Sequence, residues 1–157
     1  MDMKLAKFLC VICLAAFLVG ICWTDNYADK PVAEIEQVML HNEKVFELTK
    51  GTANDLRRYY SLNEEDYDGC ILYRSISPMD VDELLIVKMK DSSQKETLET
   101  AVENRLETQK KSFEGYGVEQ TALLSDAVFE FKGDYAFFGV SGSVQDWEKE
   151  FLSSIQN

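Results

Sequence analysis

The stretch that most constrains the fold lies near the carboxyl end, at residues 127–141. From residue 127 to 132, apolar side chains at every second position alternate with Val128, Glu130 and Lys132. Gly133-Asp134 then leads directly into a second β-prone run, YAFFGVS. Because a two-residue connection containing glycine favours the tight turn between neighbouring strands, this stretch predicts an antiparallel β-hairpin.

A second hairpin is predicted earlier in the chain. Residues 70–73 and 84–90 form two β-prone runs, and the second run alternates in character along its length. The loop that joins them, roughly ten residues long, contains Pro78. The two predicted hairpins together supply four strands.

Helical patterns occupy most of the remaining chain. The predicted helices are 31–46, with Val32, Ile35, Val38 and Met39 on one face; 53–61, opened by Thr52-Ala-Asn-Asp55; 93–113, opened by Ser93-Gln-Lys-Glu96; and one that starts at Ser143. A shorter segment between Gly117 and Ser125 is less regular. The order α-α-β-β-α-β-β-α predicts an α+β fold, with a four-stranded, mostly antiparallel sheet covered by helices.

The first 24 residues have the pattern of an export signal. Lys4 and Lys7 precede an uninterrupted apolar run at residues 8–23. This run is shorter than the roughly 20 residues that span a bilayer comfortably, so a cleaved signal, with secretion, and a short anchor both remain open. We favour an anchor that leaves the domain outside the cytoplasm. Lipid attachment at Cys22 is a further alternative, although the bulky Ile21 precedes it.

The expected organisation is therefore a signal peptide or membrane anchor (1–24), a short tether (25–30) and a single extracytoplasmic domain (31–157). The whole chain of 157 residues has a net charge of −12, and the chain from residue 25 onward has 14 basic and 27 acidic residues, a net charge of −13. Such a domain repels nucleic acids and anionic lipid surfaces. Cys70 is its only cysteine, so it forms no internal disulfide.

Four segments of the chain allow a comparison with a known family: TANDLRRYYSLNEEDYDG, DELLIVKMKD, AVENRLETQKKSFEGYGVEQTALL and KGDYAFFGVS. They resemble a bacterial family known as domain of unknown function 4358, over roughly Lys30 to Ile155, and RLETQKKSFEGYG is the most specific piece. The resemblance implies a small bacterial protein behind a signal or lipoprotein sequence. It implies no activity, ligand or catalytic residue.

The acidic stretch NEEDYDGC, residues 63–70, suggests a calcium loop as one hypothesis. Glu64, Asp66 and Asp68 take the first, third and fifth positions of such a loop, with Gly69 at the sixth. The twelfth position, however, is Ser75 where a bidentate glutamate is needed. A solvated turn between a helix and a strand is the favoured interpretation, and calcium is the weaker alternative.

Other sites for chemistry are scarce. His41 is the only histidine and is predicted to face solvent, and Cys70 is predicted to be a small buried hydrophobe. No glycine-rich phosphate loop is present, so we expect no cofactor and no catalytic constellation.

Arg105 and Gln109 are the most informative polar residues, because helical spacing places both on a face that should be buried. One interpretation pairs Arg105 with a carboxylate, such as Glu130 or those of the turn at 66–68. The other is an anion-recognising groove formed by Arg105, Gln109 and the turn Gly115-Tyr116-Gly117.

The sequence therefore favours a non-enzymatic role. We expect a membrane-tethered, extracytoplasmic binding or interaction module whose partner is an unknown protein or envelope component. The alternatives are a small hydrolase that uses carboxylates and a structural accessory subunit of an envelope complex.

Overall fold

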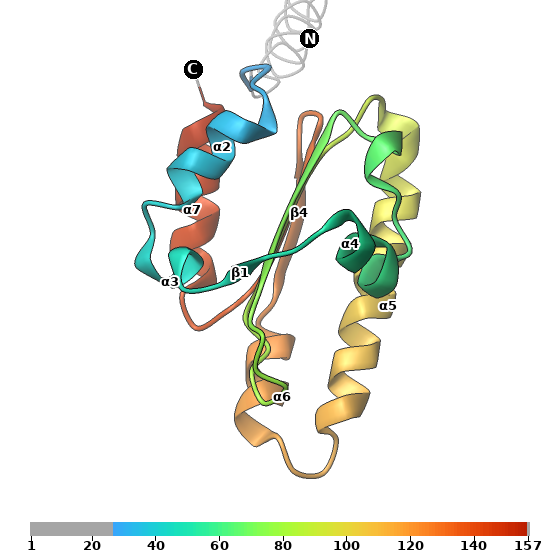
Figure 1. The fold of residues 1–157 in the computed structure, drawn as a ribbon, viewed down its shortest axis with the longest axis vertical. Helices are drawn as coiled ribbons and strands as arrows, with labels where there is room; N and C mark the ends of the chain where they lie inside the picture. The colour runs from blue at the N-terminus through green and yellow to red at the C-terminus, as the bar shows by residue number, and fades with distance from the viewer. Residues whose placement is uncertain (1–26, 157) are drawn as a thin grey trace, which may run out of the picture.

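A five-stranded antiparallel sheet forms the centre of the computed structural model, which describes residues 27–156 (Figure 1). The strands are β1 (Thr49–Lys50), β2 (Gly69–Arg74), β3 (Glu83–Lys88), β4 (Val128–Lys132) and β5 (Tyr135–Val140), in the spatial order β1-β2-β3-β5-β4. Both predicted hairpins are present as β2–β3 and β4–β5, and β3 pairs with β5 to join them. The α+β class and the antiparallel sheet are thus confirmed.

The sheet has five strands, so the predicted number of four is wrong. The additional strand, β1, pairs Thr49 with Arg74 and Lys50 with Tyr73. The Gly51 amide also donates to the Leu72 carbonyl at 2.7 Å. Two exposed residues are too few to produce an alternating pattern, and only pairing with β2 makes this segment a strand.

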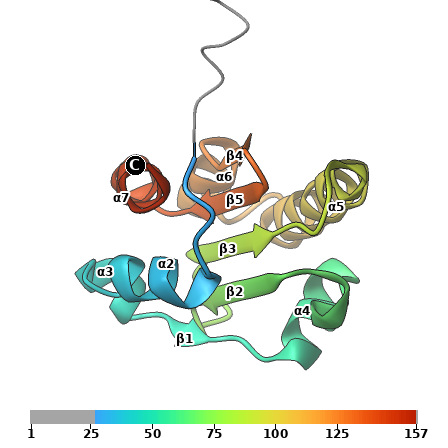
Figure 2. The ribbon, with the colours of Figure 1, turned by 90° about the horizontal axis from the view of Figure 1, so that it is seen from above.

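Helices cover both faces of the sheet. They are α2 (Val32–Met39), α3 (Glu43–Phe46), α4 (Ala53–Tyr60), α5 (Lys95–Phe113), α6 (Val118–Ser125) and α7 (Val144–Ile155), with short 3-10 helices η1 (Glu64–Asp66) and η2 (Ser92–Gln94). Figure 2 shows α2, α3 and α7 on one side of the sheet and α4 and α5 on the other. The sheet therefore has two buried faces.

The predicted helix 31–46 is divided into α2 and α3. Asn42 has extended backbone geometry between them, and its side chain accepts a hydrogen bond from the Lys44 amide at 3.1 Å. Asparagine at this position supplies the acceptor that the first turn of a new helix needs. The apolar stripe continues across the break, which is why the sequence pattern predicts one helix.

The predicted helix starts have different outcomes. The capping box of Thr52 and Asp55 is present, with both reciprocal hydrogen bonds. The capping box predicted for Ser93 and Glu96 is wrong. Asp91 accepts the hydrogen bond from the Ser93 amide and opens η2, so α5 begins only at Lys95.

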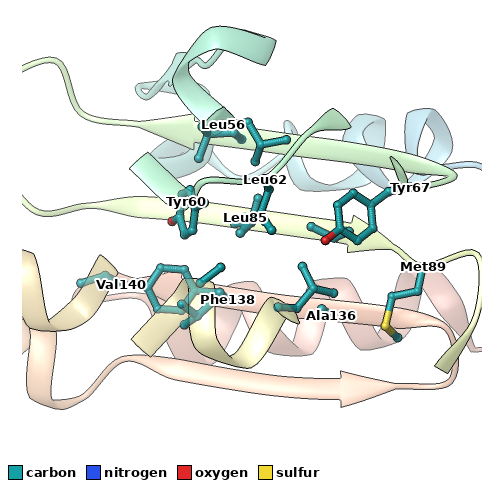
Figure 3. Close-up of a cluster of buried hydrophobic side chains, with 14 of the residues drawn as sticks. Leu56, Tyr60, Leu62, Tyr67, Leu85, Met89, Ala136, Phe138 and Val140 are labelled. Carbon is teal, nitrogen blue, oxygen red and sulfur yellow. The ribbon is translucent and has the colours of Figure 1, made fainter. Parts of the chain in front are cut away.

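Two hydrophobic clusters lie on the two faces of the sheet. Alternation along β3 sends Leu85 and Val87 toward α4 and α5, and Leu84 and Ile86 toward α2 and α7. Figure 3 shows the first cluster, in which Tyr60 lies beside the side chains of the sheet. Burial of β3 on both faces explains its nearly continuous apolar sequence.

The expected signal or anchor at residues 1–24 lies outside the described residues. Within residues 27–156, no helix combines the length and apolar character needed to cross a membrane. The described part of the predicted tether lies against the domain: the Ala28 amide donates to the Ile155 carbonyl, and the Lys30 amide donates to the Tyr135 hydroxyl at 2.8 Å.

Candidate functional site

A buried carboxylate marks the site. Glu83 is the first residue of β3 and is only 1% exposed. A carboxylate at this depth is destabilising unless it is paired and hydrogen-bonded. Its surroundings therefore show which residues the fold brings together for that purpose.

Arg105 of α5 binds this carboxylate with two of its nitrogens. Its Nη2 lies 2.6 Å from Glu83 Oε2, and its Nε lies 3.1 and 3.2 Å from the two carboxylate oxygens. Burial alone would lower the pKa of Arg105, but the adjacent Glu83 outweighs this effect and raises it. Arg105 therefore remains charged, in the fork-like geometry that makes arginine–carboxylate pairs strong.

Two further side chains complete the shell around Glu83. The Tyr60 hydroxyl donates to Oε1 at 2.5 Å, and Gln109 Nε2 donates to Oε2 at 3.3 Å. Burial, followed by the charge of Glu83, raises the pKa of the Tyr60 hydroxyl well above its usual value, so the hydroxyl keeps its proton and acts as a donor. Residues from α4, β3 and α5 thus meet at one carboxylate.

In the structure, Arg105 is paired with a carboxylate. The partner is Glu83, whereas Glu130 pairs with Lys132 at 3.0 Å. Glu83 could not be identified from sequence, because no local pattern connects the start of a strand with a helical residue 22 positions later.

The ring of Tyr59 lies directly beside this network. The guanidinium carbons of Arg105, Arg74 and Arg58 lie 4.6, 4.7 and 5.4 Å from its centre. Guanidinium groups at such distances are attracted to the electron-rich face of an aromatic ring. Tyr59 therefore helps to fix the position of three arginines.

Between α4 and α5 lies an open groove of about 590 Å³. Its floor and walls include Tyr59 and Arg105. The other lining residues are Arg58, Tyr60, Ser61, Leu62, Glu96, Thr97, Thr100, Ala101, Asn104 and Thr108. Hydroxyl and amide groups that both donate and accept hydrogen bonds dominate the α5 side.

The predicted binding residues do not all surround this groove. Gln109 is buried and does not line it, and Gly115 lines a separate groove of about 750 Å³ together with residues of α5 and α6. Tyr116 is 64% exposed and its hydroxyl donates to the Ser112 carbonyl. Gly115 has a φ of +87°, and Gly117 donates its amide to the Phe113 carbonyl, so both glycines end α5.

The acidic stretch forms η1 and leads into β2. Two of its backbone carbonyls are occupied by side chains: Lys90 Nζ donates to Glu65 and Gln94 Nε2 donates to Asp66, at 2.7 and 2.9 Å. Over residues 27–156, no three His, Cys, Asp or Glu side chains are grouped as metal ligands. The candidate ligands Glu64, Asp66 and Asp68 all have exposed side chains.

The two other candidates for chemistry lie away from the groove. His41 is exposed, and its Nδ1 lies 2.7 Å from the Gln37 carbonyl. Cys70 is partly buried at the start of β2, and this burial raises the pKa of its thiol to about 12. A thiol that stays protonated is a poor nucleophile.

Asp82 provides a test of the local electrostatics. Burial, and then the neighbouring Asp80, raise its pKa, while the Ser141 hydroxyl donates to its Oδ2 at 3.2 Å. Because the folded state binds this proton more tightly than the unfolded chain, the charged form lowers stability at neutral pH, and this effect disappears as the pH falls through the raised pKa toward the ordinary one.

We therefore expect Asp82→Asn to raise the free energy of unfolding at pH 7 by about 0.5 kcal/mol, a value reduced for solvent screening. Urea unfolding at pH 7 and near pH 4 checks this prediction, and the difference between the two proteins should shrink in acid. A variant that is less stable at pH 7, or a difference that does not change with pH, would contradict it.

Comparison with known proteins places the site in a family. Residues 42–141 match the family model described as Domain of unknown function (DUF4358). The matched segment contains all five strands, Glu83, and the parts of α4 and α5 that line the groove. No curated protein and no solved structure matches the chain.

Proposed function

Because this chain belongs to the family described as domain of unknown function DUF4358, a description that names no activity, we propose a function from the groove itself. The protein is a membrane-tethered, extracytoplasmic binding module, and the groove between α4 and α5 receives a small polar ligand. The observation that carries this proposal is an open groove with hydrogen-bonding walls, whose floor is held in place by the Glu83 network.

The size and chemistry of the groove support a small ligand. Its volume of about 590 Å³ lies within the range common for small-molecule sites. Thr97, Thr100, Asn104 and Thr108 succeed one another at helical spacings of three and four residues, so they form one polar edge of α5. Tyr59 and Ser61 contribute the opposite edge from α4 and its end.

Glu83 supports binding over carboxylate-dependent hydrolysis. Its two oxygens accept hydrogen bonds from Tyr60, Arg105 and Gln109, and 1% exposure keeps it from direct contact with a ligand. A general acid or base must reach the reacting group or a water molecule beside it. Glu83 instead holds the floor of the groove.

The extracytoplasmic location rests on the sequence pattern of residues 1–24. A reporter enzyme that is active only outside the cytoplasm, fused after Asn157 and expressed in a bacterial host, tests it. Activity is expected with the full chain and should be lost when residues 1–24 are removed. Equal inactivity of both fusions would contradict the proposed location.

Backbone amide NMR spectra of the full chain in nonionic detergent test the binding function. The probes are glucose, N-acetylglucosamine, glutaramide, glutarate and inorganic phosphate, added one at a time. We expect at least one of them to shift the amide signals of residues 59–62 and 97–108 with saturation.

A matched pair of variants locates any binding. Thr100→Trp fills the groove from an exposed helical position, whereas Thr121→Trp adds the same bulk on α6, outside the groove. Binding should be lost in the first variant and kept in the second. The proposal fails if no probe shifts these signals, or if the shifts persist in Thr100→Trp.

A further inference from the structure

Two of the four arginines of this acidic chain, Arg58 and Arg105, line the groove. The sequence has four arginines, Arg57, Arg58, Arg74 and Arg105, in a protein of net charge −12. Three of them surround the Tyr59 ring, and the fourth, Arg57, precedes Arg58 on α4. The twelve lysines, in contrast, are distributed along the chain from Lys4 to Lys149.

The charges of these arginines are only partly neutralised within the protein. Glu83 occupies Nε and Nη2 of Arg105, and among the described residues no acceptor is bonded to Nη1. Arg74 Nη2 lies 3.6 Å from Asp55, a long contact for an ion pair. Arg58 is exposed, and within residues 27–156 no carboxylate forms a salt bridge with it. The positive charge that lacks a carboxylate partner at the groove is therefore that of Arg58.

The position of Arg58 and Arg105 suits a shared ligand. Both line the groove, and both guanidinium groups lie within 5.4 Å of the centre of the same tyrosine ring. A planar guanidinium offers parallel N–H groups that match the oxygens of a carboxylate or a phosphate. Glu96 is the only carboxylate among the residues that line the groove. The buried Glu83 already balances much of the charge of Arg105, so Arg58 supplies the charge that an anion would neutralise.

We propose that the α4–α5 groove selects a small ligand carrying a carboxylate or phosphate group, bound between Arg58 and Arg105 beside Tyr59. This inference rests on the proposed binding function and specifies the chemical class of the ligand. The anion supplies the negatively charged partner that Arg58 lacks among the described residues. The net negative charge of the protein repels anions at long range. At the groove, the arginines attract them at short range.

Calorimetric titration of the full chain in nonionic detergent tests the inference, at low ionic strength because salt weakens such contacts. Glutarate and glutaramide form a matched pair, since they have the same carbon chain and differ in charge. We expect glutarate to bind about tenfold more tightly than glutaramide. Inorganic phosphate, titrated in parallel, shows whether phosphate or carboxylate is preferred.

Two charge-removing variants provide the control. Arg58→Gln should weaken glutarate binding about tenfold, whereas Lys110→Gln, at an exposed position of α5 that lines the other groove, should leave it unchanged. Thermal unfolding checks that both variants are folded, and Arg58 is exposed, so its replacement should not disturb the core.

The outcomes separate this inference from the function on which it rests. If glutaramide or a sugar binds in the groove as tightly as glutarate, or if Arg58→Gln has no effect, the anion selectivity is wrong and the binding function stands. If neither glutarate nor phosphate binds while a neutral probe does, the same conclusion follows. If no probe of any kind reaches the groove, both proposals fail.

Discussion

Replacing Arg105 by alanine is expected to lower the free energy of unfolding by about 3–5 kcal/mol. The substitution leaves Glu83 charged and 1% exposed, without the three contacts that Arg105 Nε and Nη2 make to its oxygens. Tyr60 and Gln109 stay in place, but neither supplies a positive charge. Urea unfolding followed by circular dichroism measures the loss.

Two controls separate a buried charge from the loss of side-chain packing. Lys110→Ala removes a positive charge from an exposed position of the same helix and should change stability by less than about 0.5 kcal/mol. Replacing Glu83 by Leu and Arg105 by Met together should be less destabilising than Arg105→Ala alone, because no unpaired charge remains. A loss below about 1 kcal/mol for Arg105→Ala would contradict the network as described.

Trp147→Ala should have an effect of comparable size, about 3–5 kcal/mol, in the other half of the core. Trp147 is fully buried in α7 and belongs to the cluster with Phe137 and Phe151. Among residues 27–156 its Nε1 has no hydrogen-bond partner, so the expected loss comes from packing and the cavity left behind.

The matched control for this variant is Gln145→Ala, an exposed position of the same helix that should change stability by less than about 0.5 kcal/mol. Trp147→Phe fills part of the cavity and should fall between the two. Urea unfolding again gives the values. Equal stability of the Trp147→Ala and Gln145→Ala variants would contradict the assignment of α7 to the core.

The fold was predictable where a local pattern and tertiary packing agree. The two hairpins follow from alternation and from the Gly133-Asp134 turn, in which Gly133 has a φ of +57°. The strand β1 was not predictable, because two residues have no period of their own and depend on β2. The break between α2 and α3 at Asn42 was not predictable either, because the apolar stripe continues through it.

Only the α5 residues of the Glu83 network were predictable from sequence. A polar residue on an apolar helical face must find a partner, so Arg105 and Gln109 could be selected from sequence. Their partner Glu83 lies one residue before the predicted strand 84–90, where nothing distinguishes it from the other acids. The arginines around Tyr59 come from α4, β2 and α5, and only the packing of these elements unites them.

The most direct test of the groove is the set of arginine side-chain N–H signals in a ¹⁵N spectrum of the full chain, which has only four arginines. Addition of glutarate should shift the Nε signals of Arg58 and Arg105 with saturation. Arg57, which donates to Asn63 at 2.9 Å and does not line the groove, should shift least. Signals that do not move, or that all drift equally without saturation, would contradict an anion site between α4 and α5.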